Sequence, residues 1–193
     1  MHFEEGFTYH IYNRSNQRLY KTRENYLYFL EKFRNYILPY TDVLAWCLMS
    51  NHFHFMLCPN KNATEMVKEK HLPHTQVLSK QFGTFLSSYT KAFNKQNNRR
   101  GSLFAHNTES KLLNQNSIIQ IGETKLSYAV NCFRYIHYNP VEANLVESMH
   151  EWEFSSYNDY TGKRNGSLVN KKLALQMINY DEDNFESWSL MDL

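Results

Sequence analysis

Apolar and polar residues follow one another in blocks that predict strands and helices along the chain. Residues 7–13 are rich in aromatic and β-branched side chains, which is typical of a strand. Residues 22–40 carry apolar side chains at helical spacing, with a threonine placed to cap the start and a proline near the end. Residues 42–49 and 52–58 then predict a hairpin, because a turn-like Ser-Asn pair separates two runs of strand length.

The second half of the chain is mainly helical in pattern. A short helix is predicted over 63–70 and a longer one over 75–97, whose apolar residues form a single stripe. Residues 103–113 are compatible with a strand, and residues 125–138 predict a third helix that ends at an Asn-Pro pair. Beyond it we expect a loop over 162–170 and an acidic, loosely ordered end.

This order of elements predicts an α+β fold of the ferredoxin-like kind. Its antiparallel sheet would have helices packed on one face, which leaves the other face free for a ligand. The length of 193 residues suits one domain with an extension, and the sequence has no internal repeat.

Composition narrows the class of protein. Hydrophobic residues make up 42% of the chain, which is enough for a core without covalent staples. The three cysteines are odd in number and argue against a disulfide framework, and no cluster of cysteine and histidine suggests structural zinc. The first residues lack the basic and apolar pattern of a signal peptide, and no apolar run approaches the ~18 residues of a membrane span. We therefore expect a globular cytoplasmic protein.

The net charge of +2 hides an uneven distribution. Residues 61–111 hold nine basic and three acidic residues, a charge of +6, whereas residues 141–193 hold ten acidic and four basic residues, a charge of −6. Such asymmetry is expected of a chain that touches a polyanion with one face. A solvated helix face with an acidic tail explains the charges as well at this point.

His52 and His54 are the first candidates for chemistry. Alternate side chains of a strand share a face, so both imidazoles point the same way and could hold one metal ion, while Phe53 and Phe55 face the core. The alternative is two half-exposed histidines that bind nothing, since histidine fills many roles. No carboxylate neighbours the pair, which argues against a zinc hydrolase.

Tyr89 is the candidate nucleophile. Cleavage of a phosphodiester needs a nucleophile or activated water beside a metal, and tyrosine is competent in that role. Tyr89 lies in the basic segment with Lys91 and Lys95 close by, and Asn94 follows as a possible oxygen ligand. The alternative is that Tyr89 is buried, because it belongs to the apolar stripe of the predicted helix.

Four segments resemble the single-tyrosine HUH transposases, and in particular their REP-associated branch. Residues 45–57 (AWCLMSNHFHFML) are similar to the family signature around its histidine pair, with Ser50 in place of the usual proline. The other segments are similar to the family's N-terminal strand and turn, its "YxxxFN…GxLF" stretch and its "RYIHxNP…WxxSSY" block, and they comprise residues 9–18, 89–104 and 134–157. We therefore expect a transposase-like domain over residues 1–160 and a C-terminal extension with an acidic tail over 161–193.

The resemblance implies the ferredoxin-like HUH core and a reaction, the cleavage and rejoining of single-stranded DNA near a hairpin. His52 and His54 would hold Mg²⁺ or Mn²⁺, with Asn94 as a third ligand, and the ion would polarise the scissile phosphate. Tyr89 would attack phosphorus to form a 5′-phosphotyrosine, and in this context we favour it as nucleophile over burial. Because the covalent link conserves the bond energy, no nucleotide cofactor is expected.

Other residues rank behind these. Tyr135 and Tyr138 are the next candidate nucleophiles, but their segment has the pattern of a packing helix. We interpret His10 and His137 as structural or supporting residues.

The expected partner is single-stranded DNA with a hairpin, bound by a monomer rather than a dimer and without a membrane. Phosphate contacts are expected from six basic residues, Arg14, Arg18, Lys91, Lys95, Arg99 and Arg100. Exposed aromatic side chains would stack on unpaired bases. The acidic end would lie away from the DNA or compete with it.

Three other functions stay open. A catalytically silent ferredoxin-like protein that binds single-stranded nucleic acid would do so whether or not a chelator is present. A rolling-circle initiator or relaxase would share the chemistry, but its usual helicase or second-tyrosine context is missing from this sequence. Finally, the histidine pair and the basic segment could serve structure and solvation alone.

Overall fold

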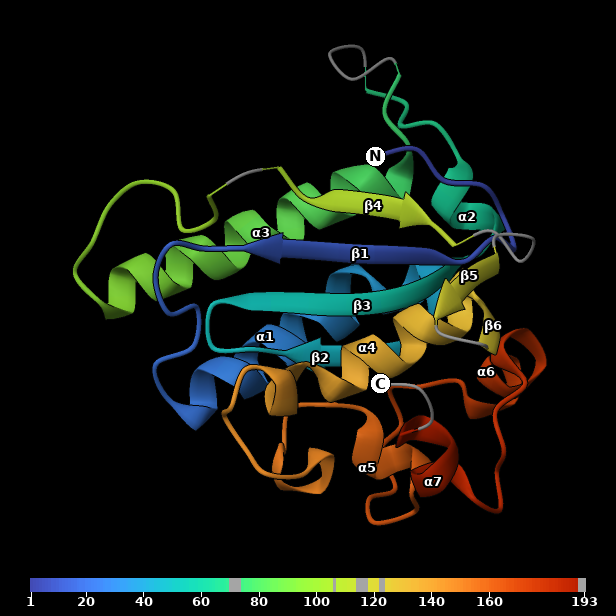
Figure 1. Cartoon of the computed structure of the whole chain (residues 1–193). Helices are drawn as coiled ribbons and strands as arrows, with labels where there is room; N and C mark the ends of the chain where they lie inside the picture. The colour runs from blue at the N-terminus through green and yellow to red at the C-terminus, as the bar shows by residue number, and fades with distance from the viewer. Residues whose placement is uncertain (70–73, 106, 114–117, 122–123, 191–193) are drawn as a thin grey trace.

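The fold is built around a four-stranded antiparallel sheet. The computed structural model describes residues 1–69, 74–105, 107–113, 118–121 and 124–190. The strands pair in the order β2-β3-β1-β4, with the bounds β1 Tyr9–Arg14, β2 Thr41–Leu48, β3 His52–Pro59 and β4 Glu109–Leu112. β1 therefore lies between β3 and β4, although neither follows it directly in sequence (Figure 1). This strand order is the ferredoxin-like one, so the predicted fold class is confirmed.

Two helices cover one face of the sheet. α1 (Arg23–Tyr36) begins after a capping box between Thr22 and Asn25 and is followed by the short η1 (Leu38–Tyr40). α3 (Val77–Gln96) buries the apolar stripe that its sequence predicts. Aromatic side chains of both helices and of β3 form what we call the helix-pair core, which includes Phe29, Phe33, Phe53, Phe55, Phe82, Phe85, Tyr89 and Phe93.

The opposite face of the sheet is covered in part by α4 (Tyr128–Glu142) and by the C-terminal segments (Figure 1). Those segments are η2 (Met149–Glu151), α5 (Tyr157–Tyr160), α6 (Lys171–Ile178) and α7 (Phe185–Leu190). Together with β2 they form the α4 core, which includes Leu44, Cys47, Cys132, Phe133, Ile136, Tyr157, Tyr160, Ile178 and Phe185. The expectation that this face stays free for a ligand is therefore corrected, because α4 packs on it and leaves a cavity above β1 and β3.

Two predicted helices have different bounds in the structure. The helix predicted over 63–70 is the short α2 (Lys61–Thr64), and residues 70–73 lie outside the described residues. The helix predicted over 125–138 starts at Tyr128, because β5 (Ile118–Ile121) and β6 (Thr124–Ser127) pair as a hairpin before it. It also runs past Pro140, since a proline this close to the end removes only one backbone donor from the helix.

The acidic end is more ordered than its composition predicts. Within the described residues, Tyr180 and Phe185 are buried, and the ring of Phe185 stacks on that of Tyr160 with centroids 5.2 Å apart. Aromatic burial therefore fixes this segment on α4, even though its acidic residues Asp181, Glu182, Asp183 and Glu186 are exposed. The domain boundary at residue 160 stays a prediction. No helix in the described ranges is long and apolar enough to cross a membrane.

We expect Phe185→Ala to lower the free energy of unfolding by about 3 kcal/mol, since it leaves a cavity among six aromatic rings. Urea denaturation at neutral pH measures this change. Leu190→Ala is the matched control on the same helix, because Leu190 is 54% exposed and its loss should shift stability by at most about 0.5 kcal/mol. Equal small effects of both variants would contradict the packing of α7 described above.

Candidate functional site

The side chains of β3 alternate between the two faces of the sheet and place a histidine pair above it. Phe53 and Phe55 point into the helix-pair core, with their rings against those of Phe29 and Phe33. His52 and His54 point to the opposite face, and their ring centroids lie 5.0 Å apart. The predicted common orientation of the two imidazoles is therefore present.

A third histidine belongs to this group. His10 on β1 lies on the same face as His54, and its Nε2 atom shares a hydrogen bond of 2.9 Å with the Nδ1 atom of His54. The Nδ1 atom of His52 lies 2.7 Å from the Oδ1 atom of Asn51, which can only accept, so this contact favours the tautomer of His52 with its proton on Nδ1. In that tautomer the Nε2 atom of His52 is the nitrogen with a lone pair.

The three rings are neutral near neutral pH. Burial and, to a smaller extent, the charge of Lys111 together lower the pKa of His10 to about 4. Burial also lowers the pKa of His54 well below its usual value, with smaller contributions from His10 and His52. For His52, burial is again the main cause of a lowered pKa, while a hydrogen bond with Asn139 opposes it and the nearby charge of Arg14 adds to it. Neutral imidazoles are the form that binds metal ions.

The donor set fits a divalent metal ion. The Nε2 atom of His54 is buried and has no hydrogen-bond partner among the described residues, so a lone pair there is available to a ligand. Asn139 adds an amide group next to His52. Among the described residues, no three histidine, cysteine or acidic side chains are arranged so that they could hold one metal ion together, and His10 is engaged with His54 instead. Two imidazoles and one amide would thus leave further positions to water or to phosphate oxygens.

Tyr135 lies next to the histidine pair. Its ring centroid is 5.5 Å from that of His54, and the residue is 38% exposed. Burial of the rest of the side chain raises the pKa of Tyr135, whereas a hydrogen bond with the Asn139 side chain lowers it. The Nδ2 atom of Asn139 also donates to the backbone oxygen of Tyr135 at 2.8 Å. Asn139 therefore contacts both His52 and Tyr135, and so connects the histidine pair with this tyrosine.

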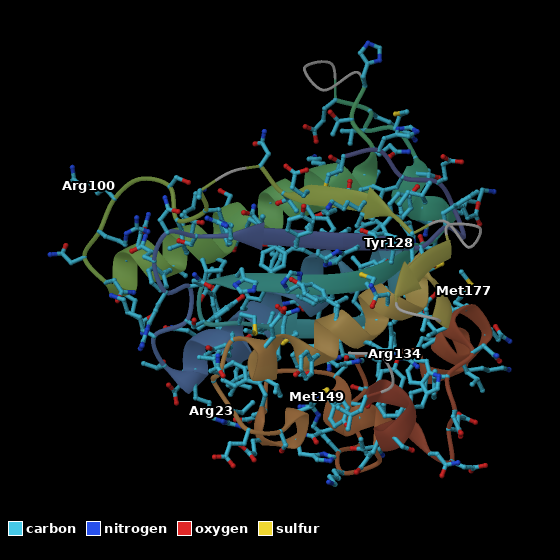
Figure 2. The ribbon with its side chains drawn as sticks, viewed as in Figure 1. Arg23, Arg100, Tyr128, Arg134, Met149 and Met177 are labelled. Carbon is cyan, nitrogen blue, oxygen red and sulfur yellow. The ribbon has the colours of Figure 1, made fainter. Side chains whose placement is uncertain are left out.

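A cavity of about 640 Å³ opens beside Tyr135, between α4 and the sheet. Tyr128 lies where α4 begins, above the sheet (Figure 2). The cavity is lined by His10, Tyr12, His54, Lys111, Tyr128, Asn131, Cys132, Tyr135, Tyr138 and Glu142. The ammonium group of Lys111 lies 5.7 Å above the ring of Tyr12 and supplies a positive charge at this wall. Aromatic walls with one cation suit an unpaired nucleotide.

Tyr89 does not join this site, and its assignment as nucleophile is corrected. The residue is 1% exposed, and its hydroxyl group donates to the backbone oxygen of Leu19 at 2.6 Å. Burial raises the pKa of Tyr89 far above its usual value. Because α3 packs on the face of the sheet opposite to His52 and His54, the sheet itself separates Tyr89 from them.

Asn94 is also on α3 and therefore on the wrong face for a metal ligand. Its Nδ2 atom donates to the backbone oxygen of Gly101 at 2.8 Å and so closes the turn after the helix. The prediction that Asn94 completes the metal site is wrong for this geometric reason.

The predicted DNA-binding residues divide into two groups. Arg14 ends β1 directly opposite His52 in the strand register, and its charge acts on that histidine. Arg18, Lys91, Lys95 and Arg100 are exposed, and Arg100 projects from the loop after α3 (Figure 2). Arg99 donates to the backbone oxygen of Ser102 at 2.9 Å and lies over Phe93, so it also holds this loop.

Sequence reasoning gave Tyr135 too little weight and missed Asn139 and Lys111. The signal was present in the segment RYIHYNP, where Tyr135 and Asn139 are four residues apart and hence on one face of a helix. The strand alternation that places His52 and His54 on one face also places His10 and Tyr12 on that face, because β1 pairs with β3 in this register.

Comparison with known proteins supports the fold. No family model and no curated protein matches this chain. A solved structure of a REP-associated tyrosine transposase bound to a REP hairpin is similar, with a TM-score of 0.59, 14% sequence identity and 84% of each chain covered. At this level of identity the likeness shows a shared fold.

Buried neutral histidines make the stability of the protein dependent on pH. Burial lowers the pKa of His137 to about 3 and that of His10 to about 4, against about 6.5 in an unfolded chain. The unfolded chain therefore binds more protons below pH 6.5, and each such histidine should reduce the free energy of unfolding by up to about 1.4 kcal/mol per pH unit. Urea denaturation between pH 7 and 5 measures the slope, which should be smaller in His137→Gln. A flat profile in the wild type would contradict the burial of these rings.

Proposed function

We propose that the chain is a metal-dependent, transposase-like endonuclease and strand transferase that acts on single-stranded DNA. The observation that carries this proposal is the convergence of two neutral histidines, an asparagine and a partly exposed tyrosine beside a cavity: His52, His54, Asn139 and Tyr135. The similarity to a REP-associated tyrosine transposase bound to a REP hairpin adds support from the fold. The site offers what phosphoryl transfer requires, namely positioning and charge stabilisation around a nucleophile.

A divalent ion would be held by His52 and His54 through their Nε2 atoms, with the amide oxygen of Asn139 as third ligand. Bound Mg²⁺ or Mn²⁺ would polarise the scissile phosphate and neutralise charge that develops on it. Asn139 would also orient the hydroxyl group of Tyr135, because its side chain reaches both residues.

Tyr135, rather than Tyr89, is the nucleophile in this proposal. Its phenolic oxygen attacks phosphorus, the bond from phosphorus to the 3′-oxygen breaks, and a 5′-phosphotyrosine and a free 3′-hydroxyl result. The proton of the phenol passes to water as the bond forms, and the departing 3′-oxygen takes up a proton from water. Lys111 lines the same cavity, where its positive charge would attract a phosphate. Attack by a 3′-hydroxyl on the phosphotyrosine reverses the step, so rejoining needs no nucleotide cofactor.

The DNA would cross the end of the sheet at which β1 and α3 finish. Arg14 would contact the phosphate nearest the histidine pair, and the exposed Arg18, Lys91, Lys95 and Arg100 would bind the flanking strand or a hairpin. Because His52, His54, Asn139 and Tyr135 converge within one chain, we propose that the protein acts as a monomer.

Tyr135→Phe should abolish a covalent adduct between the protein and a single-stranded hairpin DNA in the presence of Mn²⁺. The variant removes only the attacking oxygen, so DNA binding should change less than twofold. Denaturing gel electrophoresis with labelled hairpin libraries detects the protease-sensitive adduct, and fluorescence anisotropy measures binding.

Tyr89→Phe is the matched control, because it also removes a single hydroxyl group from an aromatic ring. It should keep the adduct and lower the free energy of unfolding by about 1 kcal/mol, since a buried hydrogen bond to Leu19 is lost. An adduct that persists in Tyr135→Phe but disappears in Tyr89→Phe would reverse the assignment. Binding without any adduct in the wild type would favour a catalytically silent binding protein.

His52→Ala and His54→Ala should each reduce adduct formation by at least about 100-fold, because each removes one metal ligand. Mn²⁺ titration followed by electron paramagnetic resonance measures the affinity of the same variants. If adduct formation in the wild type is unaffected by EDTA, the proposed role of the metal is wrong.

A further inference from the structure

His10 is placed beside His54 by the strand register. On β1 and β3, Tyr12 lies directly opposite His54 and His10 directly opposite Met56, so His10 is the diagonal neighbour of His54 on the same face. Diagonal neighbours in an antiparallel pair are within reach of long side chains. The two rings stack with centroids 5.1 Å apart, and both residues are buried.

The hydrogen bond between the two rings holds one proton, and its location decides what His54 can bind. If His54 donates from Nδ1 to Nε2 of His10, then the Nε2 atom of His54 has a lone pair. If His10 donates instead, the Nε2 atom of His54 carries a hydrogen atom and cannot bind a cation. The second arrangement buries an N–H group without an acceptor, since no described residue pairs with Nε2 of His54. A buried N–H group without a partner is rare in proteins, so the first arrangement is favoured.

We infer that His10 is a positioning residue that fixes the tautomer and ring orientation of His54, so that Nε2 of His54 faces the metal position. This inference rests on the proposed function for the identity of the ligand, but the tautomer itself is a property of the protein without metal. Partners of metal-binding histidines act in this way in general, and their loss typically reduces metal affinity or activity 10- to 100-fold. His10 then contributes to the reaction through His54 and touches neither the metal nor the DNA in this role.

Three variants test the inference. His10→Phe keeps a ring of similar size and removes the acceptor, so that His54 loses its partner on Nδ1. His10→Gln restores an acceptor, because the side-chain amide oxygen reaches about as far as the Nε2 atom of histidine. Tyr12→Phe is the matched control, since Tyr12 faces His54 across the same strand pair with ring centroids 6.0 Å apart but forms no hydrogen bond with it in the described part of the chain.

Three measurements are needed for each full-length variant. The ¹⁵N chemical shifts of the His54 ring in the metal-free protein report which nitrogen carries the proton. Titration with Mn²⁺ alone, followed by electron paramagnetic resonance, gives the affinity, and thermal unfolding verifies that each variant is folded.

In the wild type and in Tyr12→Phe, His54 should be protonated on Nδ1. In His10→Phe it should lose this single tautomer, and Mn²⁺ affinity should fall 10- to 100-fold, whereas His10→Gln should recover affinity to within about fivefold of the wild type. The inference is overturned if His54 keeps the Nδ1 tautomer and its Mn²⁺ affinity in His10→Phe, or if the wild type is protonated on Nε2. A wild type that is protonated on Nδ1 but binds no Mn²⁺ supports the tautomer and overturns the metal site of the proposed function.

Discussion

The alternation of side chains along β3 is the constraint on which the rest of the structure depends. Phe53 and Phe55 are fully buried in the helix-pair core, so the two-residue period of a strand forces His52 and His54 to the other face. A shift of the register by one residue would turn the imidazoles into the aromatic helix-pair core and the two phenylalanines toward the histidine side of the sheet. The hydrophobic effect that folds the protein therefore also holds the histidine pair in place.

The face of the sheet that carries the histidines is covered in part by the α4 core and in part by the site, and α4 contributes side chains to both. Phe133 and Ile136 pack into the α4 core, while Tyr135 and Asn139 turn toward the histidines. Residues four apart lie on one face of a helix, so a tyrosine and an asparagine at this spacing reach the same place above the sheet. The C-terminal α7 packs against α4 and supports this arrangement, because the ring of Trp188 on α7 lies 4.3 Å from the guanidinium group of Arg134 on α4.

The local elements and the fold class could be predicted from the sequence because each depends on periodicity and turn residues. The hairpin of β2 and β3, the cap at Thr22 and the stripe of α3 are all local patterns. The position of Tyr89 could not be predicted in this way. A stripe shows that a helix has a buried side, but only the topology shows which face of the sheet receives it, and α3 lies on the face away from His54.

The residues that complete the site depend on contacts between distant segments. His10 meets His54 only through the pairing of β1 with β3, and Lys111 reaches the cavity only because β4 pairs with the other edge of β1. The strands themselves could be predicted from the sequence, but the roles of His10 and Lys111 at the site could not, because these roles depend on which strands pair.

The same reasoning applies to charge, because the net value of +2 describes no particular surface. Charges act over about 8 to 10 Å in physiological salt, so only the local distribution matters to a polyanion. Lys111 stands at the cavity and Arg14 at the histidine pair, whereas Glu186 of α7 pairs with His150 and Lys163 on the α4 side of the sheet. Because Glu186 is paired with neighbouring cations, its negative charge offsets the positive charges of Lys111 and Arg14 less than the net charge of the chain suggests. Glu142, by contrast, lines the cavity itself, so the acidic residues of 141–193 are divided between the site and the α4 side of the sheet.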